Sequence, residues 1–390
     1  MQRVAIRWFA LGQGMPASAV SAALVSLLAV GCGGKDGHGA EVGVDDGIDS
    51  GIDSGIDTQG DGDGDPTTNT TSNDSPLLDQ GAGSDGEVPC GEGELCEGEC
   101  DIPPHTPCDA AANSPLIQTM GLNCANELQV QVTTYGNPGA MGRRNSFGNA
   151  GAFPPREGSG YVALGSGLVS ELDGAGGLFS SNCNSDIGNF DPGTLPAPLK
   201  GNDVGNVTCT DNQALVGTGD CSNTIESQLA GTANDYTEIR FTVKVPDTVN
   251  SISYDLAFFS YEYPDYFQSV FNDMYIGWLE SEVWTGNISF DAQGHPISLN
   301  AGFLDYKDSC APNDNACGPG VAPALHGSCM EGHAGTKWLT SSAGVKPGET
   351  ITVVFAIFDM SDSILDSYVF LDNFGWGCEG DDTPSTTPVG

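Results

Sequence analysis

Short runs in which apolar and polar residues alternate constrain this chain more than any other feature of its sequence. Four of them place an apolar residue at every second position, over 239–245, 252–258, 274–278 and 351–357. A period of two puts one face of a β-strand on a core and the other face in water. A fifth run, at 367–376, is apolar on both faces in its middle, so we expect that strand to be buried more deeply.

The connectors between these runs are rich in Gly, Pro, Asn and Asp, as in Val-Pro-Asp-Thr at 245–248 and Lys-Pro-Gly-Glu at 346–349. Long helical periodicity is nearly absent. Many short strands with turn signals between them predict an all-β fold, an antiparallel, jelly-roll-like β-sandwich with long loops over 111–380. The Gly-rich segment 125–235 shows one clear strand candidate, 161–165. We interpret it as strands of the same domain between long loops, with a separate subdomain as the alternative.

Thirteen cysteines indicate an oxidising compartment, because disulfides rarely persist in the cytosol. Four of them crowd into 89–110, where two disulfides would close a small module with almost no core; a four-thiolate zinc site is the alternative, but Cys-x-x-Cys spacing is missing. Two further pairs bracket polar loops. The disulfide candidates are Cys90, Cys96, Cys100, Cys108, Cys209, Cys221, Cys310 and Cys317. Cys329 lies between His326 and His333, and we expect it to pair with another cysteine rather than to bind a metal.

The acidic balance of the chain excludes one large class of partner. It holds 52 acidic and 12 basic residues, a formal charge of −40, and nucleic-acid binding needs clustered Lys and Arg. Residues 33–110 carry 20 of the acids and one base, Lys35. Low-complexity acidic sequence cannot bury enough apolar surface to fold. We therefore predict a disordered linker over 32–88, and a second disordered tail over 381–390.

The first 31 residues have the layout of an export signal. Arg3 and Arg7 precede an apolar stretch over 17–30, which is short for a membrane span. The stretch ends in Ala-Val-Gly before Cys32, which resembles the lipobox of bacterial lipoproteins. We expect diacylglycerol on Cys32 and a Gram-negative outer-membrane or cell-surface location, since the next residue, Gly33, is not Asp. The alternative is an ordinary secretory signal in which Cys32 is incidental.

Two stretches of the predicted sandwich resemble the choice-of-anchor L domain of bacterial surface proteins. One is Ser-Tyr-Glu-Tyr-Pro-Asp-Tyr at 260–266 followed by Phe-Asn-Asp-Met-Tyr-Ile at 271–276, and the other is Asp-Ser-Tyr-Val-Phe-Leu-Asp-Asn-Phe at 366–374. The later segments 335–340 and 345–359 are similar to myxobacterial members. The resemblance implies display at a cell surface, here by the N-terminal lipid, and implies no catalytic activity. Tyr261 departs from the pattern, because the family often has Glu there.

Two acidic sets flank the ends of predicted strands and suggest a calcium site. If the hairpin ends converge, six or more oxygen ligands could meet, as Ca²⁺ requires. The candidate ligands are Glu262, Asp265, Asn272, Asp273, Asp359 and Asp372. The alternative is that these side chains cap strand ends and turns through hydrogen bonds to the backbone.

Four aromatic residues within 261–267 suggest a second site. Tyr261 and Tyr266 are candidates for a platform that binds a glycan or a surface protein, while Tyr263 and Phe267 are expected to pack into the sandwich rim.

The sequence favours a binding or structural module over an enzyme. We expect such a module to serve adhesion or envelope architecture. It lacks a Gly-x-Ser-x-Gly elbow, a His-Glu-x-x-His motif and a Walker loop. The alternative is a carbohydrate-active hydrolase on a similar sandwich, with Glu262, Asp265 and Asp273 as its carboxylates.

Overall fold

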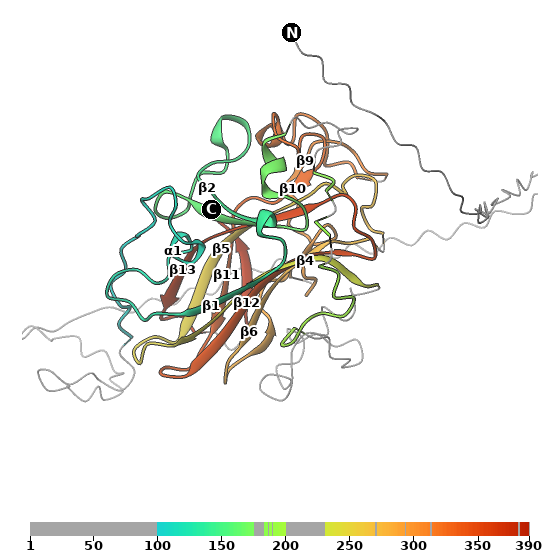
Figure 1. Cartoon of the computed structure of the whole chain (residues 1–390). Coiled ribbons are helices and arrows are strands. Elements are labelled where there is room, and N and C mark those ends of the chain that lie inside the picture. Colours follow the sequence, from blue (N-terminus) through green and yellow to red (C-terminus); the bar gives the residue numbers. More distant parts are fainter. Residues whose placement is uncertain are drawn as a thin grey trace, which may run out of the picture. The chain divides into compact units, whose positions relative to one another are not determined.

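The fold was examined in a computed structural model, which describes residues 100–174, 183–185, 187–188, 190–199, 231–269, 271–292, 294–312, 314–380 and 383–389. These residues form two antiparallel sheets with almost no helix (Figure 1). The fold class predicted from the alternating runs is therefore confirmed.

The first sheet, sheet A, runs in the order β1-β4-β12-β6-β7, with β8 paired to β6. Its strands are β1 (Gln131–Tyr135), β4 (Ala233–Lys244), β6 (Met274–Glu280), β7 (Thr285–Asn287), β8 (Ile297–Ser298) and β12 (Thr350–Met360). The longest pairing in this sheet joins β4 and β12. A bulge between Ile357 and Asp359, near the end of β12, interrupts this pairing.

The second sheet, sheet B, runs in the order β14-β11-β5-β13-β3-β2, with β10 paired to β5 and β9 to β10. Its strands are β2 (Met141–Arg144), β3 (Tyr161–Gly165), β5 (Ser251–Ser260), β9 (Tyr306–Lys307), β10 (Ala334–Gly335), β11 (Leu339–Gly344), β13 (Ser367–Gly377) and β14 (Ser385–Pro388). The one α-helix among the described residues is α1 (Leu116–Thr119); short 3-10 turns are η1 (Pro138–Ala140), η2 (Asn149–Gly151), η3 (Val169–Asp173) and η5 (Pro323–Leu325).

The main core lies between the two sheets, and it takes the alternate residues that the sequence predicts for the runs at 239–245, 252–258 and 351–357. The run at 274–278 is the exception, because its apolar residues lie on the outer face of sheet A while Tyr275 and Leu279 enter the central core. Ile239 and Phe241 of β4 meet Leu256 and Phe258 of β5 and Phe355 of β12 in this layer. The predicted exposure of the opposite face is wrong for the central strands. Met274 and Trp278 of β6, with Phe358 of β12, form a second buried cluster on the outer face of sheet A, and Phe259 of β5 and Phe370 of β13 anchor a third on the outer face of sheet B. The outer faces of both sheets are therefore buried at these residues, while Thr242 and Lys244 of β4 remain exposed.

The described part of the Cys-rich segment, residues 100–110, belongs to this domain. Cys100 pairs with Cys378, 278 residues away, and Cys108 pairs with Cys124. The backbone N–H of Asp101 also donates to the carbonyl of Thr248 at 3.0 Å. The predicted internal pairing over 89–110 is therefore wrong for Cys100 and Cys108. The reason is that Cys100 and Cys378, which are far apart in the sequence, lie next to each other in the fold. The spacing of cysteines in the sequence does not reveal this contact.

Other cysteine predictions have mixed outcomes. Cys310 and Cys317 pair as predicted, and Cys329 pairs with Cys183 rather than serving as a metal ligand. Cys90, Cys96, Cys209 and Cys221 lie outside the described residues, as do Cys32 and the predicted linker over 32–88.

The C-terminal end of the predicted sandwich differs from expectation, whereas the described part of 125–235 agrees with it. Residues 385–388, predicted as part of a disordered tail, form β14 and pair with β11 at the edge of sheet B. The segment 125–235 supplies β1, β2 and β3 to the two sheets, with β3 where the sequence predicts a strand. Its described strands therefore belong to the same domain.

Candidate functional site

Two connections between the sheets cross at the same end of the sandwich. The first leaves β5 at Ser260 in sheet B and enters β6 at Met274 in sheet A; the second leaves β12 at Met360 in sheet A and enters β13 at Ser367 in sheet B. Ser260 pairs with Ser367 in one sheet, and Phe358 pairs with Met274 in the other. The acidic residues of both connections are thereby brought together.

Four buried carboxylates line this place, which we call the carboxylate seam: Glu262, Asp273, Asp359 and Asp366. Each is at most 1 % exposed. Three of them, Glu262, Asp273 and Asp359, belong to the predicted calcium set, whose side chains the fold thus partly assembles. Asp366 was not among the predicted ligands.

Hydrogen bonds across the seam hold Asp273 in place. Its Oδ1 accepts from the N–H of Met360 at 3.2 Å, and its Oδ2 accepts from the hydroxyl of Ser367 at 2.8 Å. Its own N–H donates to Glu262 Oε2 at 3.3 Å. One carboxylate therefore links the ends of β6, β12 and β13.

Asp359 and Asp366 have fewer donors. Neither oxygen of Asp359 accepts a hydrogen bond of normal geometry, and Asp366 Oδ1 accepts none. The Ser166 hydroxyl lies beside Asp359, but it is also within 3.4 Å of the Ser367 carbonyl, to which it donates. Asp366 Oδ2 is better served, because it accepts from the Tyr368 hydroxyl and the Ser185 N–H, each at 3.1 Å. Buried carboxylate oxygens without donors are costly.

Burial and mutual repulsion disfavour the charged forms of the seam. Burial raises the pKa of Glu262 to about 10, with the charge of Asp273 adding to the effect. Burial raises the pKa of Asp273 to about 7, although its hydrogen bonds oppose the change. The pKa values of Asp359 and Asp366 are raised well above their usual range, first by burial. Among the described residues, no Lys, Arg or His forms an ion pair with any of the four.

The other three predicted ligands lie apart from the seam. Asp265 is exposed on the turn after β5. Asn272 is buried, and its side-chain oxygen accepts from the N–H of Asn300 at 3.2 Å, as the capping alternative predicts. Asp372 lies in β13, six residues beyond Asp366. At about 3.3 Å per residue, the two residues are roughly 20 Å apart along the strand.

The two candidate platform rings have different surroundings. Tyr261 is 4 % exposed and its ring stacks on His333 with centroids 3.6 Å apart, which leaves little of that ring for a ligand. Tyr266 is half-buried and contacts Phe271 edge to face at 5.3 Å. Tyr263 is fully buried, as expected, and its hydroxyl donates to the carbonyl of Ser309.

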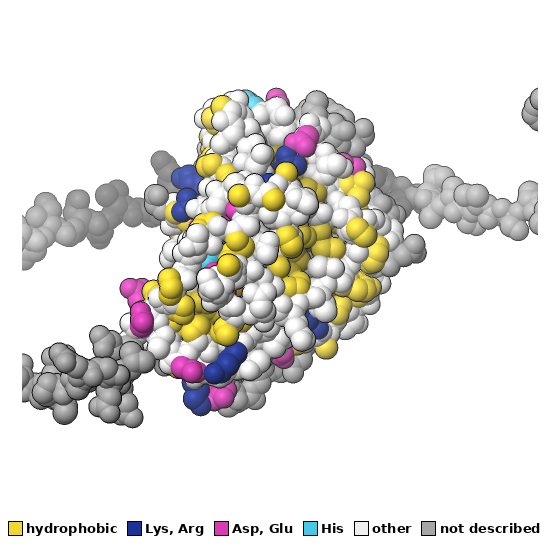
Figure 2. All heavy atoms as spheres, turned by 60° about the vertical axis from the view of Figure 1, so that its left-hand side comes forward, with side chains coloured by type: hydrophobic (Ala, Val, Ile, Leu, Met, Phe, Trp, Pro, Cys, Tyr) yellow, Lys and Arg dark blue, Asp and Glu magenta, His cyan; other side chains and the backbone are white. Residues whose placement is uncertain are grey.

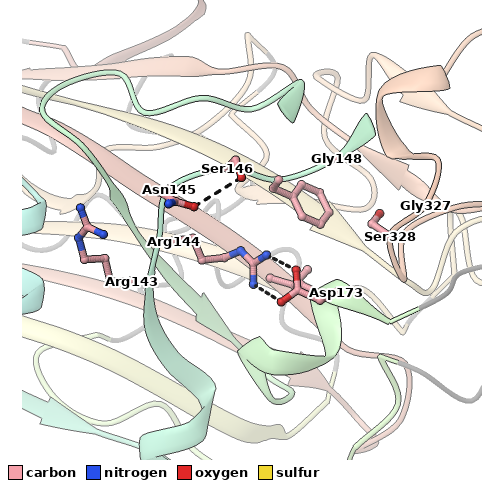
Figure 3. Close-up of a pocket in the computed structure, with 10 residues that line it drawn as sticks. Arg143, Arg144, Asn145, Ser146, Gly148, Asp173, Gly327 and Ser328 are labelled. Atoms are coloured by element: carbon pink, nitrogen blue, oxygen red, sulfur yellow. Dashed lines mark hydrogen bonds and ion pairs between the residues drawn. The ribbon is translucent and has the colours of Figure 1, made fainter. Parts of the chain in front are cut away.

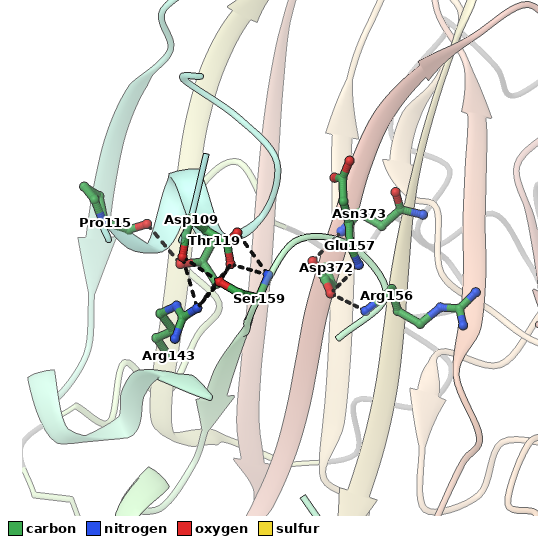
Figure 4. A network of polar contacts seen from close by, with 9 residues as sticks. All are labelled: Asp109, Pro115, Thr119, Arg143, Arg156, Glu157, Ser159, Asp372 and Asn373. Atoms are coloured by element: carbon green, nitrogen blue, oxygen red, sulfur yellow. Dashed lines mark hydrogen bonds and ion pairs between the residues drawn. The ribbon is translucent and has the colours of Figure 1, made fainter. Parts of the chain in front are cut away.

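A second group of buried carboxylates has ample donors (Figure 4). Asp109 accepts from the Ser159 N–H and pairs with the Arg143 guanidinium at 3.2 Å. Asp372 Oδ2 accepts from the N–H groups of Arg156 and Glu157 at 2.6 and 3.1 Å. Asp255, 1 % exposed, pairs with Arg156 Nε at 2.9 Å and also accepts from Thr340 and Asn373. We call Asp109, Asp255 and Asp372 the bonded carboxylates.

The surface offers two hollows. A polar cavity of about 470 Å³ lies between the end of β2, η3 and residues 327–328. Figure 3 shows Arg144 and Asp173 facing each other in it, with contacts that include Nη1 to Oδ2 at 3.3 Å, while Arg143 stands apart. Among the described residues that line the cavity, Arg144 is paired with Asp173 and Arg143 with Asp109, so neither arginine is free to bind an anionic ligand.

The other hollow is a more apolar groove of about 690 Å³ between residues 102–106, the β4–β5 turn and the end of β13. Ile102 and Leu128, which line it, are about half exposed. Figure 2 shows that hydrophobic side chains are scattered over one face of the domain, with few charged groups among them.

One trio of ligand atoms among the described His, Cys, Asp and Glu side chains lies mutually within 4.8 Å, from His105, Cys124 and Glu127. The sulfur of Cys124 is in the disulfide with Cys108. It therefore offers no thiolate, and this trio is not a metal site. Within the described part of the chain, no helix has the length and apolar character needed to cross a membrane.

Comparison with known proteins gives one match. The family model of the choice-of-anchor L domain matches residues 112–375, well over half of the chain. The chain belongs to the choice-of-anchor L domain family. No curated protein and no solved structure matched the sequence.

The matched segment begins just after Cys108 and ends just before Cys378. It contains both sheets except β14, and all four carboxylates of the seam. Family membership and the disulfides fit an exported, surface-associated protein.

Proposed function

We propose that this chain is a lipid-anchored module of the bacterial cell surface. Acyl chains on Cys32 would hold it in the outer membrane, residues 32–88 would act as an extended acidic tether, and the β-sandwich would be displayed at its end. The observation that carries the proposal is the choice-of-anchor L match over a sandwich closed by disulfides. More than one acyl chain would make the anchoring stable.

The disulfide between Cys100 and Cys378 supports a role at the end of a tether. It joins Cys100 to Cys378, which directly follows β13, a central strand of sheet B. A pull on the preceding linker would therefore reach β13 directly rather than peel residues 100–130 from the domain.

The buried state of the candidate catalytic carboxylates favours a binding or structural role over hydrolysis. Glu262 and Asp273 are 1 % and 0 % exposed, respectively. A polysaccharide must contact both carboxylates of a glycosidase from an open cleft. We propose that the ligand is a glycan or a protein of a cell surface, and that adhesion or envelope architecture is the setting.

The anchor can be tested by replacing Cys32. Cys32→Ser should abolish labelling by a fatty-acid analogue and move the protein from the membrane fraction to the soluble exported fraction. Gly31→Ala is the matched control, because it keeps a small residue before the cysteine and should leave labelling intact. Membrane retention and labelling of Cys32→Ser would contradict the proposal.

The binding role can be tested on glycan arrays and whole cells. Saturable binding without product release is expected, and Tyr266→Ala should weaken it because it removes the half-buried platform ring. Tyr135→Ala, which removes an exposed tyrosine in β1, is the control. Release of reducing sugar by the purified protein would favour the hydrolase instead.

A further inference from the structure

We propose that the carboxylate seam binds one Ca²⁺ ion, with Asp359 as its central ligand and Asp273 or Asp366 as the second carboxylate. The site lies where the two sheet-to-sheet connections meet, so a bound ion would join the end of β12 to the start of β6 or of β13. It is independent of the lipid anchor and of any surface ligand.

The negative charge of the carboxylate seam is not compensated by a basic side chain among the described residues. Four carboxylates that are at most 1 % exposed lie together with no basic side chain among the described residues paired to them. Removing even one carboxylate from water is costly unless it is paired and hydrogen-bonded. A bound cation relieves both the burial cost and the repulsion among neighbours.

Several buried carboxylate oxygens of the seam also have no hydrogen-bond donor. Both oxygens of Asp359 and Oδ1 of Asp366 accept no hydrogen bond of normal geometry, although these side chains are fully buried. Elsewhere in the same domain, Asp109 and Asp255 have several donors each. The fold can therefore supply donors to buried carboxylates, but it does not do so at Asp359.

The chemistry of the donors selects the type of ion. Every candidate ligand is an oxygen, from carboxylates and from the hydroxyl of Ser166 beside Asp359. Hard cations such as Ca²⁺ take six to eight such oxygens. No three carboxylates of the seam present oxygens mutually within 4.8 Å. The ion would thus be held by Asp359 and one of its two neighbours, Asp273 or Asp366. Neutral oxygens and water would complete its coordination shell.

A shared proton is the competing way to stabilise this cluster, since Asp273 and Asp359 are close enough to hydrogen-bond to each other when one is protonated. The two cases differ in a simple respect. A proton-sharing seam needs no metal, whereas a cation site gives a protein whose stability depends on calcium at constant pH.

The test uses the full chain, produced under oxidising conditions and stripped of metal with EGTA. Calcium chloride up to 1 mM, with magnesium chloride as a second arm, is titrated while thermal melting and heat of binding are followed at pH 7.5. We expect saturable binding of one Ca²⁺ per chain and a rise in Tm of several degrees, because an ion that binds the folded state alone stabilises it. No binding heat and no change in Tm would overturn the proposal and favour the shared proton.

Two variants locate the site. Asp359→Asn should lose both the binding heat and the rise in Tm, and Asp265→Asn is the matched control because Asp265 is exposed and lies outside the seam. If Asp359→Asn does not fold, Asp366→Asn replaces it with the same expectation. Calcium binding that survives in the folded seam variant would place the ion elsewhere and overturn the assignment.

Discussion

The bonded carboxylates and the carboxylate seam solve the same physical problem in different ways. Asp109 and Asp255 are as deeply buried as Asp273, yet each has an arginine and several hydrogen-bond donors around it. Asp359 is fully buried with neither. Both groups lie in one sandwich and in one compartment, so the difference cannot be attributed to solvent or to overall charge.

The contrast shows what keeps this unusually acidic domain folded. Basic residues number only 12 in the whole chain, and Arg143 and Arg156 are used to neutralise carboxylates on sheet B. The crossover end has no such partner among the described residues. We infer that an external cation does at the seam what an arginine does at Asp109 and at Asp255.

The largest effect is expected from breaking an arginine pair. Arg143→Met should leave Asp109 buried without its counter-charge, which typically costs about 3–5 kcal/mol of unfolding free energy; the Ser159 donors should keep the loss near 3 kcal/mol, about the lower end. Urea unfolding measures it. The loss should be equal in calcium and in EGTA, and a loss seen in calcium alone would erase the distinction between the two regions.

The seam should respond in the opposite manner when Asp359 is replaced. In saturating calcium, Asp359→Asn should lose the ion's contribution, about 2–3 kcal/mol for an ion at roughly 100 times its dissociation constant. In EGTA the same variant should be equal to or more stable than the parent chain, because an amide removes one charge from a repelling cluster. Urea unfolding under both conditions gives the comparison, and an equal loss in both would contradict the account.

A smaller effect is expected at Asp255. Asp255→Asn removes the charge that pairs with Arg156, but the arginine side chain is 33 % exposed and can be hydrated instead. Thr340 and Asn373 lose a charged acceptor but keep an amide oxygen. A loss of about 1–2 kcal/mol, independent of calcium, should appear in urea unfolding. Arg156→Lys serves as the control that retains the charge.

The last prediction concerns the pH dependence of stability at Asp372. Burial raises its pKa to about 7 in the folded state, although three backbone N–H groups oppose the change. The folded state therefore binds this proton more tightly than the unfolded state does. Its stabilising contribution is complete below about pH 4 and is lost as pH rises through 7. Asp372→Asn should flatten the fall in Tm over this range, and an unchanged slope would exclude the raised pKa.

The alternating runs predict the strands well because the spacing of side chains on a strand is fixed by local geometry. The runs at 239–245 and 351–357 lie in β4 and β12, with the predicted residues in the central core. The second buried face was missed because loops such as 322–330 cover sheet B. Which loop covers a sheet depends on contacts between distant segments, and local alternation does not record them.

Part of the candidate site was predictable, because the positions of strand ends follow from local alternation in the sequence. Glu262, Asp273 and Asp359 flank strands whose ends meet, and the sequence places them near those ends. Asp372 could have been excluded, since six residues of extended chain separate it from Asp366. Asp366 itself could not be selected, because the direction of its side chain depends on the turn 361–366, where Ser361 and Leu365 have positive φ. Likewise, the short loop between Cys310 and Cys317 made that pair predictable, while Cys100 and Cys378 are joined only by the fold.

The most direct test is a crystal structure of the protein grown with calcium, with anomalous diffraction data. We predict one anomalous peak in the carboxylate seam, with oxygens of Asp359 and at least one of Asp273 and Asp366 at about 2.3–2.6 Å from it. A seam without a peak, in which the oxygens of Asp273 and Asp359 approach each other at hydrogen-bonding distance, would contradict the account and show that protons alone stabilise the buried carboxylates.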